Sequence, residues 1–271
     1  NNPNDRRKVS TPSHLFNSYF SLDKNALSDL VSTKQHSSDF IATRTSYITI
    51  RLWTMCMFFC VTVPIFSLFD FMIFSTSEAI NLLVARIALS LSLFLLAQSL
   101  KVWPLVRTVR VVMPLAFLFP MLFFVASMLI IKESPSESIP SIFSMMPFFI
   151  LAMLGLFPLT ISGGLFVIVC MFTPFVFYNL VIVNQPFWLF FNEVWLFILF
   201  AGISLWLQLG QLSMLMKLYR ESTVDPLTKL INRRVLLRLA HTSNDYHEMY
   251  SVIMFDLDRF KRVNDTYGHA A

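Results

Sequence analysis

Long apolar runs separated by short polar segments dominate the middle of this chain. Between residues 111 and 216 the only charged residues are Lys132, Glu133, Glu137 and Glu193. A helix needs about 20 mostly apolar residues to cross a hydrocarbon core of ~30 Å. Runs of that length predict six membrane spans, at about 47–69, 79–99, 105–131, 142–158, 161–183 and 187–211.

The basic residues predict how these spans are oriented. One side of the six spans carries Arg44, Arg51, Lys101, Arg107, Arg110, Lys217 and Arg220. The other side carries only Lys132. Lys and Arg are enriched in cytoplasmic connections, so both termini are expected in the cytoplasm. Six spans also return the chain to the side on which it started.

Composition supports this interpretation and limits the alternatives. The 271 residues are 56% hydrophobic, which is too apolar for one soluble globule. The net charge of +5 is explained by basic residues beside the spans and in the terminal segments, so no nucleic-acid partner is expected. The three cysteines show no disulfide or metal spacing, and all five histidines lie outside the spans.

Three further segments frame the membrane domain, which we place at 44–211. Residues 1–43 are rich in Ser, Thr and Asn and are expected to form a largely disordered cytoplasmic tail. A signalling helix is expected at 205–224, where apolar residues follow the 4-3-4-3 spacing of a coiled coil. Bundle packing is the alternative explanation of this stripe, whose members are Leu205, Leu209, Leu212, Met216 and Tyr219.

Arg86 is the one charged residue clearly within an expected span. An intramembrane charge is a functional hypothesis by default. Arg86 is therefore a candidate sensor residue that binds an anionic or polar signal or stabilises one state of the bundle, with Asp70, Glu78 and Glu193 as candidate partners. The alternative is that its side chain extends to the outer headgroups. Prolines such as Pro64 also lie within the spans, where each frees a backbone carbonyl that a neighbouring helix must satisfy.

The pattern changes after residue 224. Asp225 and Pro226 form a helix-start pair, because Asp accepts from free backbone N–H groups and Pro suits the first turn. Asn232 offers a second cap, ahead of an apolar stripe over 233–241. Residues 250–257 are nearly all apolar and predict a short strand, and a further apolar pattern follows it. This order predicts the helix–strand–helix opening of an α/β or α+β domain, which residues 225–271 begin.

Two carboxylates, Asp256 and Asp258, stand at the carboxyl end of this strand, where open sheets bind ligands. On a regular strand they face opposite ways, so one could hold a metal ion while the other is structural. Lys261 and Arg262 add positive charge within reach of a phosphate. Oxygen ligands beside cations are typical of a Mg²⁺–nucleotide site.

Two motifs give a specific resemblance. Residues 225–234, DPLTKLINRR, resemble the DxLTxLxNRR opening of the GGDEF domains, the diguanylate cyclases. Residues 256–265, DLDRFKRVND, resemble their DxDxFKxxND segment, and Gly268-His269 is similar to the GH that follows. The resemblance covers about 221–271. It implies that this segment starts an α/β, nucleotidyl-cyclase-like domain. Together with the expected spans, this predicts a mostly α-helical chain with a six-helix transmembrane bundle, a coiled-coil-like linker helix and then the start of that domain.

The resemblance also implies roles for individual residues. Asp256 and Lys261 are the expected catalytic residues. Asp256, with the Leu257 carbonyl, is expected to hold Mg²⁺ or Mn²⁺. The residues expected to bind the GTP phosphates and the guanine edge are Arg259, Phe260, Lys261 and Asn264.

The implied activity is the synthesis of cyclic di-GMP from two GTP by a signal-responsive enzyme of the bacterial inner membrane. Each domain holds one GTP, so a homodimer through 205–224 is expected. The family's GG(D/E)EF hairpin and RxxD inhibition site do not occur within the 271 residues, so this stretch alone is expected to be inactive. The alternatives are a catalytically inactive GGDEF-like receptor or, from another class, a small transporter.

Overall fold

A computed structural model describes residues 30–33, 36–131, 143–183 and 186–223, together with Thr228, Leu230, Asn232, 235–237 and three isolated positions at 251–255. The chain forms two compact units, Asn1–Tyr219 and Arg220–Ala271. The longer elements of the described ranges are all helical: α3 (Ser38–Ile65), α4 (Ser67–Ile73), α5 (Thr76–Val102), α6 (Val106–Ile131), α8 (Met146–Leu154), α9 (Ile161–Phe177), the π-helix η2 (Tyr178–Ile182) and α10 (Phe187–Thr223).

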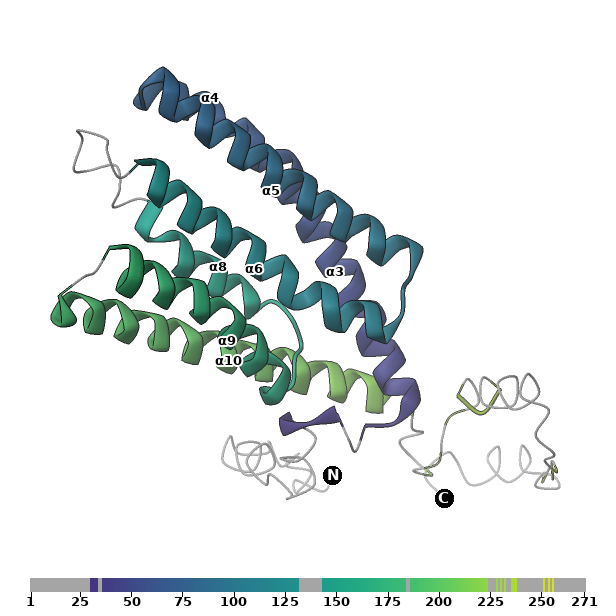
Figure 1. Cartoon of the computed structure of the whole chain (residues 1–271). Helices are drawn as coiled ribbons and strands as arrows, with labels where there is room; N and C mark the ends of the chain where they lie inside the picture. Colours follow the sequence, from purple (N-terminus) through teal and green to yellow (C-terminus); the bar gives the residue numbers. More distant parts are fainter. Residues whose placement is uncertain are drawn as a thin grey trace, which may run out of the picture. The chain divides into compact units, whose positions relative to one another are not determined.

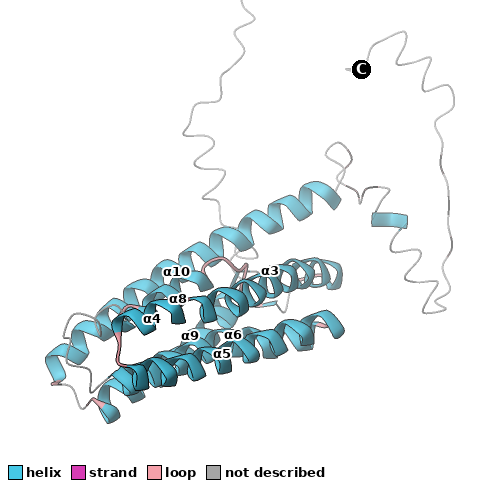
Figure 2. Cartoon of the chain, turned by 90° about the horizontal axis from the view of Figure 1, so that it is seen from above, coloured by secondary structure: helices cyan, strands magenta, loops and turns pink. Residues whose placement is uncertain are grey.

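The helices of the first unit run roughly along one direction, and successive helices alternate in sense except that α4 continues α3 (Figures 1 and 2). Helix α3 packs against α5 and α6, α5 packs against α6, and α6 packs against α8 and α9. Many large apolar side chains face outward, such as Met72, Phe149 and Trp206. Outward apolar faces are what a bundle surrounded by lipid requires, because the hydrocarbon offers no water to polar groups.

Five helical stretches of the described ranges are long and apolar enough to cross a membrane: 39–73, 76–102, 106–131, 161–182 and 187–223. One of the six expected spans is not among these five helices. The expected span at 142–158 contains α8, which has only nine residues and is about 14 Å long at 1.5 Å per residue. The helix ends at Leu154, and Pro158 prevents it from resuming there because it disfavours helical backbone at Phe157.

A non-helical segment, residues 155–160, completes the passage that α8 begins. Its residues are buried except Leu156, whose carbonyl accepts a hydrogen bond from Nη1 of Arg51 at 2.5 Å. The hydroxyl of Thr160 then caps α9 by accepting from the Gly163 N–H. Non-helical backbone is tolerated at membrane depth where protein covers it, and here it is covered.

The connection between α8 and α9 is made by 155–160. Gly163 and Gly164, which follow it, lie in the first turn of α9. Gly164 serves another purpose, because a Cβ there would contact the Gln208 side chain and approach Cδ2 of Leu205 to 3.0 Å. The glycine thus lets α9 and α10 approach closely.

Aromatic side chains fill much of the core. Phe157 of the non-helical segment meets Phe117 of α6 edge-on, with ring centroids 5.9 Å apart. Phe175 of α9 packs against Phe197 of α10 at 5.0 Å and against Phe148 of α8 at 6.2 Å. These rings join the non-helical segment to α6, and they join α8 and α10 to α9.

Candidate functional site

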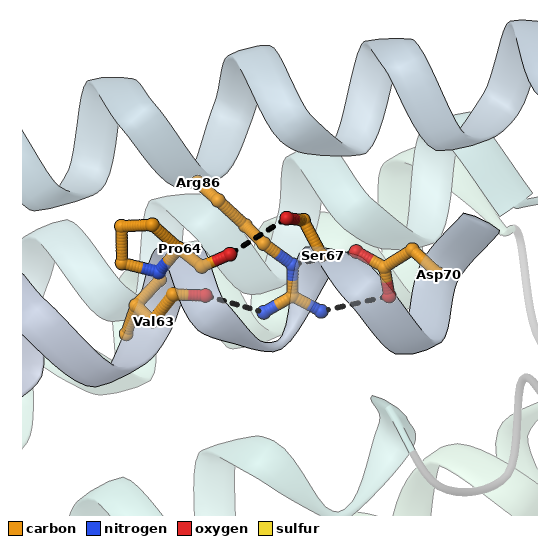
Figure 3. Close-up of polar contacts among 5 residues, drawn as sticks. All are labelled: Val63, Pro64, Ser67, Asp70 and Arg86. Atoms are coloured by element: carbon orange, nitrogen blue, oxygen red, sulfur yellow. Dashed lines mark hydrogen bonds and ion pairs between the residues drawn. The ribbon is translucent and has the colours of Figure 1, made fainter. Parts of the chain in front are cut away.

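Arg86 and Asp70 form a buried ion pair between α5 and α4. Nε of Arg86 lies 2.6 Å from Oδ2 of Asp70, and Nη2 lies 3.0 Å from Oδ1. Arg86 is 8% exposed and Asp70 is 3% exposed. Figure 3 shows the guanidinium reaching from α5 toward Asp70 and the carbonyl of Val63. This bidentate geometry matches the planar fork of Arg and neutralises both charges inside the bundle.

The Arg86 side chain therefore does not extend to the headgroups, which was the alternative expectation. Of the three candidate carboxylates, the one bonded to Arg86 is Asp70. Glu78 instead completes a capping box with Ser75 at the start of α5. A capping box satisfies free N–H groups at a helix start, so Glu78 has a local structural role.

Pro64, near the end of α3, frees a backbone carbonyl beside this ion pair. Because Pro64 has no N–H, the carbonyl four residues earlier, on Cys60, loses its helical partner. The hydroxyl of Ser90 on α5 donates to that carbonyl at 2.5 Å. Ser67 in turn donates to the Pro64 carbonyl at 2.6 Å, and Nη1 of Arg86 lies 3.5 Å from the Val63 carbonyl. Polar groups of α4 and α5 thus surround the break between α3 and α4.

Ser90 was not singled out from the sequence. Nothing in the sequence around Ser90 indicates its role. Pro64 does give a signal, because a proline leaves the carbonyl four residues earlier without its helical donor. A hydroxyl on a neighbouring helix is one of the groups that can satisfy such a carbonyl in a membrane.

The opposite end of α3 is bonded to α10. Oη of Tyr219 donates to Oδ2 of Asp39 at 2.7 Å, and the Tyr219 ring meets Phe40 at 5.1 Å. Three turns further along α3, Nη1 of Arg51 lies 3.4 Å from Oε1 of Gln211. Helix α3 therefore runs from the ion pair at one end to the last turns of α10 at the other.

The 4-3-4-3 stripe of α10 faces its own bundle. Leu212 is fully buried, and Leu205 packs against the core. The Tyr219 hydroxyl donates to Asp39, and the Tyr219 ring packs against Phe40. Within the single chain, the stripe packs in its own bundle. A homodimer through 205–224 stays a prediction.

Asn232 caps the short helical stretch at 235–237, as its position predicted. Its Oδ1 accepts from the Val235 N–H at 3.0 Å. Its own N–H donates to the Thr223 carbonyl at 2.8 Å, and its Nδ2 donates to the Ser222 carbonyl. Asn232 therefore ties the last turn of α10 to the segment that follows.

The expected nucleotide and metal residues lie outside the described residues: Asp256, Leu257, Arg259, Phe260, Lys261 and Asn264. Their roles stay predictions. Within the part of the chain that the structure does describe, there is no cluster of three or more His, Cys, Asp or Glu side chains that could hold a metal ion. The oxygen donors expected at residues 256 and 257 are of the kind that Mg²⁺ prefers.

Comparison with known proteins identifies the end of the chain. The family model described as diguanylate cyclase, GGDEF domain, matches residues 222–271. The probable diguanylate cyclase DgcE of Escherichia coli (strain K12) is 44% identical over 62 residues, which are 21% of this chain and 6% of that protein. The chain thus spans a small part of the curated relative it matches. No solved structure matches the chain significantly.

Proposed function

Because residues 222–271 are the start of a GGDEF domain, we propose that the complete protein is a membrane-bound, signal-responsive diguanylate cyclase. It condenses two GTP into cyclic di-GMP and releases two pyrophosphates. The observation that carries this proposal is the family match in the segment joined directly to α10. The five apolar helices support a multi-pass membrane protein, and we place it in the bacterial inner membrane with both termini in the cytoplasm.

The residues proposed for the chemistry are those of the second motif. Asp256 and the Leu257 carbonyl hold Mg²⁺ or Mn²⁺, which neutralises phosphate charge when bound. Lys261 and the backbone N–H groups at Arg259 and Phe260 hold the phosphates. Asn264 bonds the guanine edge.

The membrane unit is proposed to act as the input of this enzyme. The support is the position of α3. One end of α3 lies beside the ion pair of Arg86 and Asp70, and its other end is hydrogen-bonded to α10. Since Asn232 ties α10 to the start of the GGDEF segment, a displacement of α3 has a bonded route to the catalytic domain. We propose that α10 then changes how two copies of that domain face each other in a homodimer.

The test uses membranes containing the complete protein, incubated with GTP and Mg²⁺, with cyclic di-GMP measured by mass spectrometry. Asp256→Ala is expected to abolish the product, while Asp245→Ala, in the polar stretch before the strand, leaves it unchanged. Retained synthesis in Asp256→Ala would contradict the metal assignment. GTP binding without any product from the unaltered protein would instead identify the alternative, a catalytically inactive GGDEF-like receptor.

A further inference from the structure

We propose that a cavity between α3, α5, α6 and α8 binds a neutral, apolar, membrane-soluble molecule carrying one oxygen acceptor. The binding of this molecule by the cavity is independent of the proposed function. Its role as the signal of the enzyme rests on the proposed function.

The cavity has a volume of about 480 Å³, which lies within the range of roughly 300–1,000 Å³ typical of small-molecule sites. Its walls come from 55–63 of α3 with Phe66 just after it, 86–93 of α5, 116–123 of α6 and 146–153 of α8. All but two of the lining side chains are apolar or a thiol, and the exceptions are Thr62 and Arg86. Such walls select an apolar ligand.

The two polar side chains explain why the ligand is neutral. The Thr62 hydroxyl already donates to the Phe58 carbonyl of its own helix at 3.0 Å. The guanidinium of Arg86 is compensated by Asp70 through two hydrogen bonds. The cavity therefore offers no uncompensated charge, and a charged ligand would lose its hydration without gaining a counter-ion. Of the signals expected at Arg86 from the sequence, anionic or polar, the proposal takes the polar, uncharged one.

Arg86 nevertheless retains a donor for a neutral ligand. Its Nη1 has one hydrogen-bond partner in the structure, the Val63 carbonyl, at 3.5 Å. That distance is beyond the usual 2.7–3.2 Å of an N–H···O bond. A carbonyl or hydroxyl oxygen of the ligand can accept from Nη1 without breaking the bonds to Asp70. The Phe123 ring, 5.5 Å from Cζ of Arg86, covers another side of the guanidinium.

Occupancy of this cavity has a structural route to α10. Residues 55–63 of α3 form one wall, and the same helix is bonded to Tyr219 through Asp39. Residues 146–153 of α8 form another wall, and the segment after α8 accepts a hydrogen bond from Arg51 of α3. A ligand between α3 and α8 thus acts on two elements that Arg51 joins.

Benzophenone is a suitable probe, because it is neutral, apolar, photoactivatable and carries one carbonyl oxygen. The full chain, reconstituted in phosphatidylethanolamine–phosphatidylglycerol vesicles, would be irradiated with increasing benzophenone, and labelled residues would be identified by mass spectrometry. We expect saturable labelling at Met55 and Met153, which line the cavity. Met72, which is 82% exposed, should show labelling that rises in proportion to the probe.

A cavity-filling variant provides the matched comparison. Ala116 lines the cavity and is 1% exposed, whereas Ala88 lies on the exposed face of α5. In Ala116→Phe, labelling of Met55 and Met153 is expected to rise in proportion to the probe concentration, as it does at Met72. In Ala88→Phe, labelling of Met55 and Met153 is expected to remain saturable. The smaller Ala116→Leu serves if Ala116→Phe does not fold, as judged by its melting temperature.

Proportional labelling at Met55 and Met153 in the unaltered protein would overturn the proposal, because the cavity would then hold only bilayer acyl chains. Saturable labelling that Ala116→Phe leaves unchanged would overturn it as well. Both readouts are independent of cyclic di-GMP. Saturable labelling in a protein that makes no product would therefore support the binding site while contradicting the proposed function.

Discussion

The Tyr219 hydroxyl donates to the Asp39 carboxylate at 2.7 Å, joining the last turns of α10 to the first turn of α3 across 180 residues of sequence. The bond brings the beginning and the end of the membrane unit to the same end of the bundle (Figure 1). It also places a carboxyl oxygen against the helix that leads into the GGDEF segment. Any movement of α3 along its axis acts directly on Tyr219.

Removing this hydroxyl should change regulation more than stability. Tyr219→Phe keeps the ring contact with Phe40 but loses a hydrogen bond to a charged group, worth about 1.5–3 kcal/mol. We expect a lower melting temperature and altered cyclic di-GMP synthesis in membranes. Tyr47→Phe is the matched control, because the Tyr47 ring rather than its hydroxyl contacts Arg51. Equal effects of the two changes would argue against a specific Asp39–Tyr219 coupling.

The ion pair predicts strong non-additivity between Arg86 and Asp70. Arg86→Leu or Asp70→Leu alone leaves an unpaired buried charge, which costs about 3–5 kcal/mol. The double variant leaves none, so its melting temperature is expected above that of either single variant. A thermal-shift series on the detergent-purified full chain measures this, and additive losses would show that the pair is not coupled.

Ser90 should matter only because Pro64 is present. Ser90→Ala leaves the Cys60 carbonyl unsatisfied and is expected to cost about 1–3 kcal/mol. Adding Pro64→Ala restores the helical donor to that carbonyl, so the double variant should recover stability. Ser92→Ala is the control, because Ser92 is exposed and bonds only the Ala88 carbonyl of its own helix. A double variant less stable than Ser90→Ala would contradict this account of the break.

Two glycines should respond oppositely to alanine. A Cβ at Gly164 would collide with the buried Gln208 side chain, and such overpacking costs about 1–3 kcal/mol. A Cβ at Gly210 meets nothing within 4 Å, so Gly210→Ala should stabilise α10 by up to about 1 kcal/mol through helix propensity. Melting temperatures of the two variants should therefore shift in opposite directions. A shared direction would show that α9 and α10 do not depend on their approach at Gly164.

Sequence reasoning located the membrane helices and the GGDEF segment because both depend on local information. Apolar run length placed the spans, and two motifs placed the domain start. It did not find that residues 142–158 form a short helix and a buried non-helical segment, because hydropathy does not distinguish helical from irregular apolar chain. Pro158 was the available signal for the break.

Pairing was harder to predict than position. Arg86 was expected inside a span, but three carboxylates were equally suitable partners until the turn between α4 and α5 brought Asp70 to it. The apolar stripe of α10 predicted which side of this helix packs against another helix. It left open which helix that is, because a heptad spacing is compatible with packing against any neighbouring helix. The roles of Asp256 and Asn264 remain predictions, because these residues lie outside the part that the structure describes.

The spacing of Asp70 and Arg86 has a consequence for biosynthesis. The two residues are sixteen positions apart, on either side of the turn that Ser75 begins. They can therefore neutralise each other within one helical hairpin, before α6 has been made. Since a lone charge at membrane depth is expensive, α4 and α5 should enter the bilayer together as a hairpin, and a variant lacking either partner should be retained at the translocon.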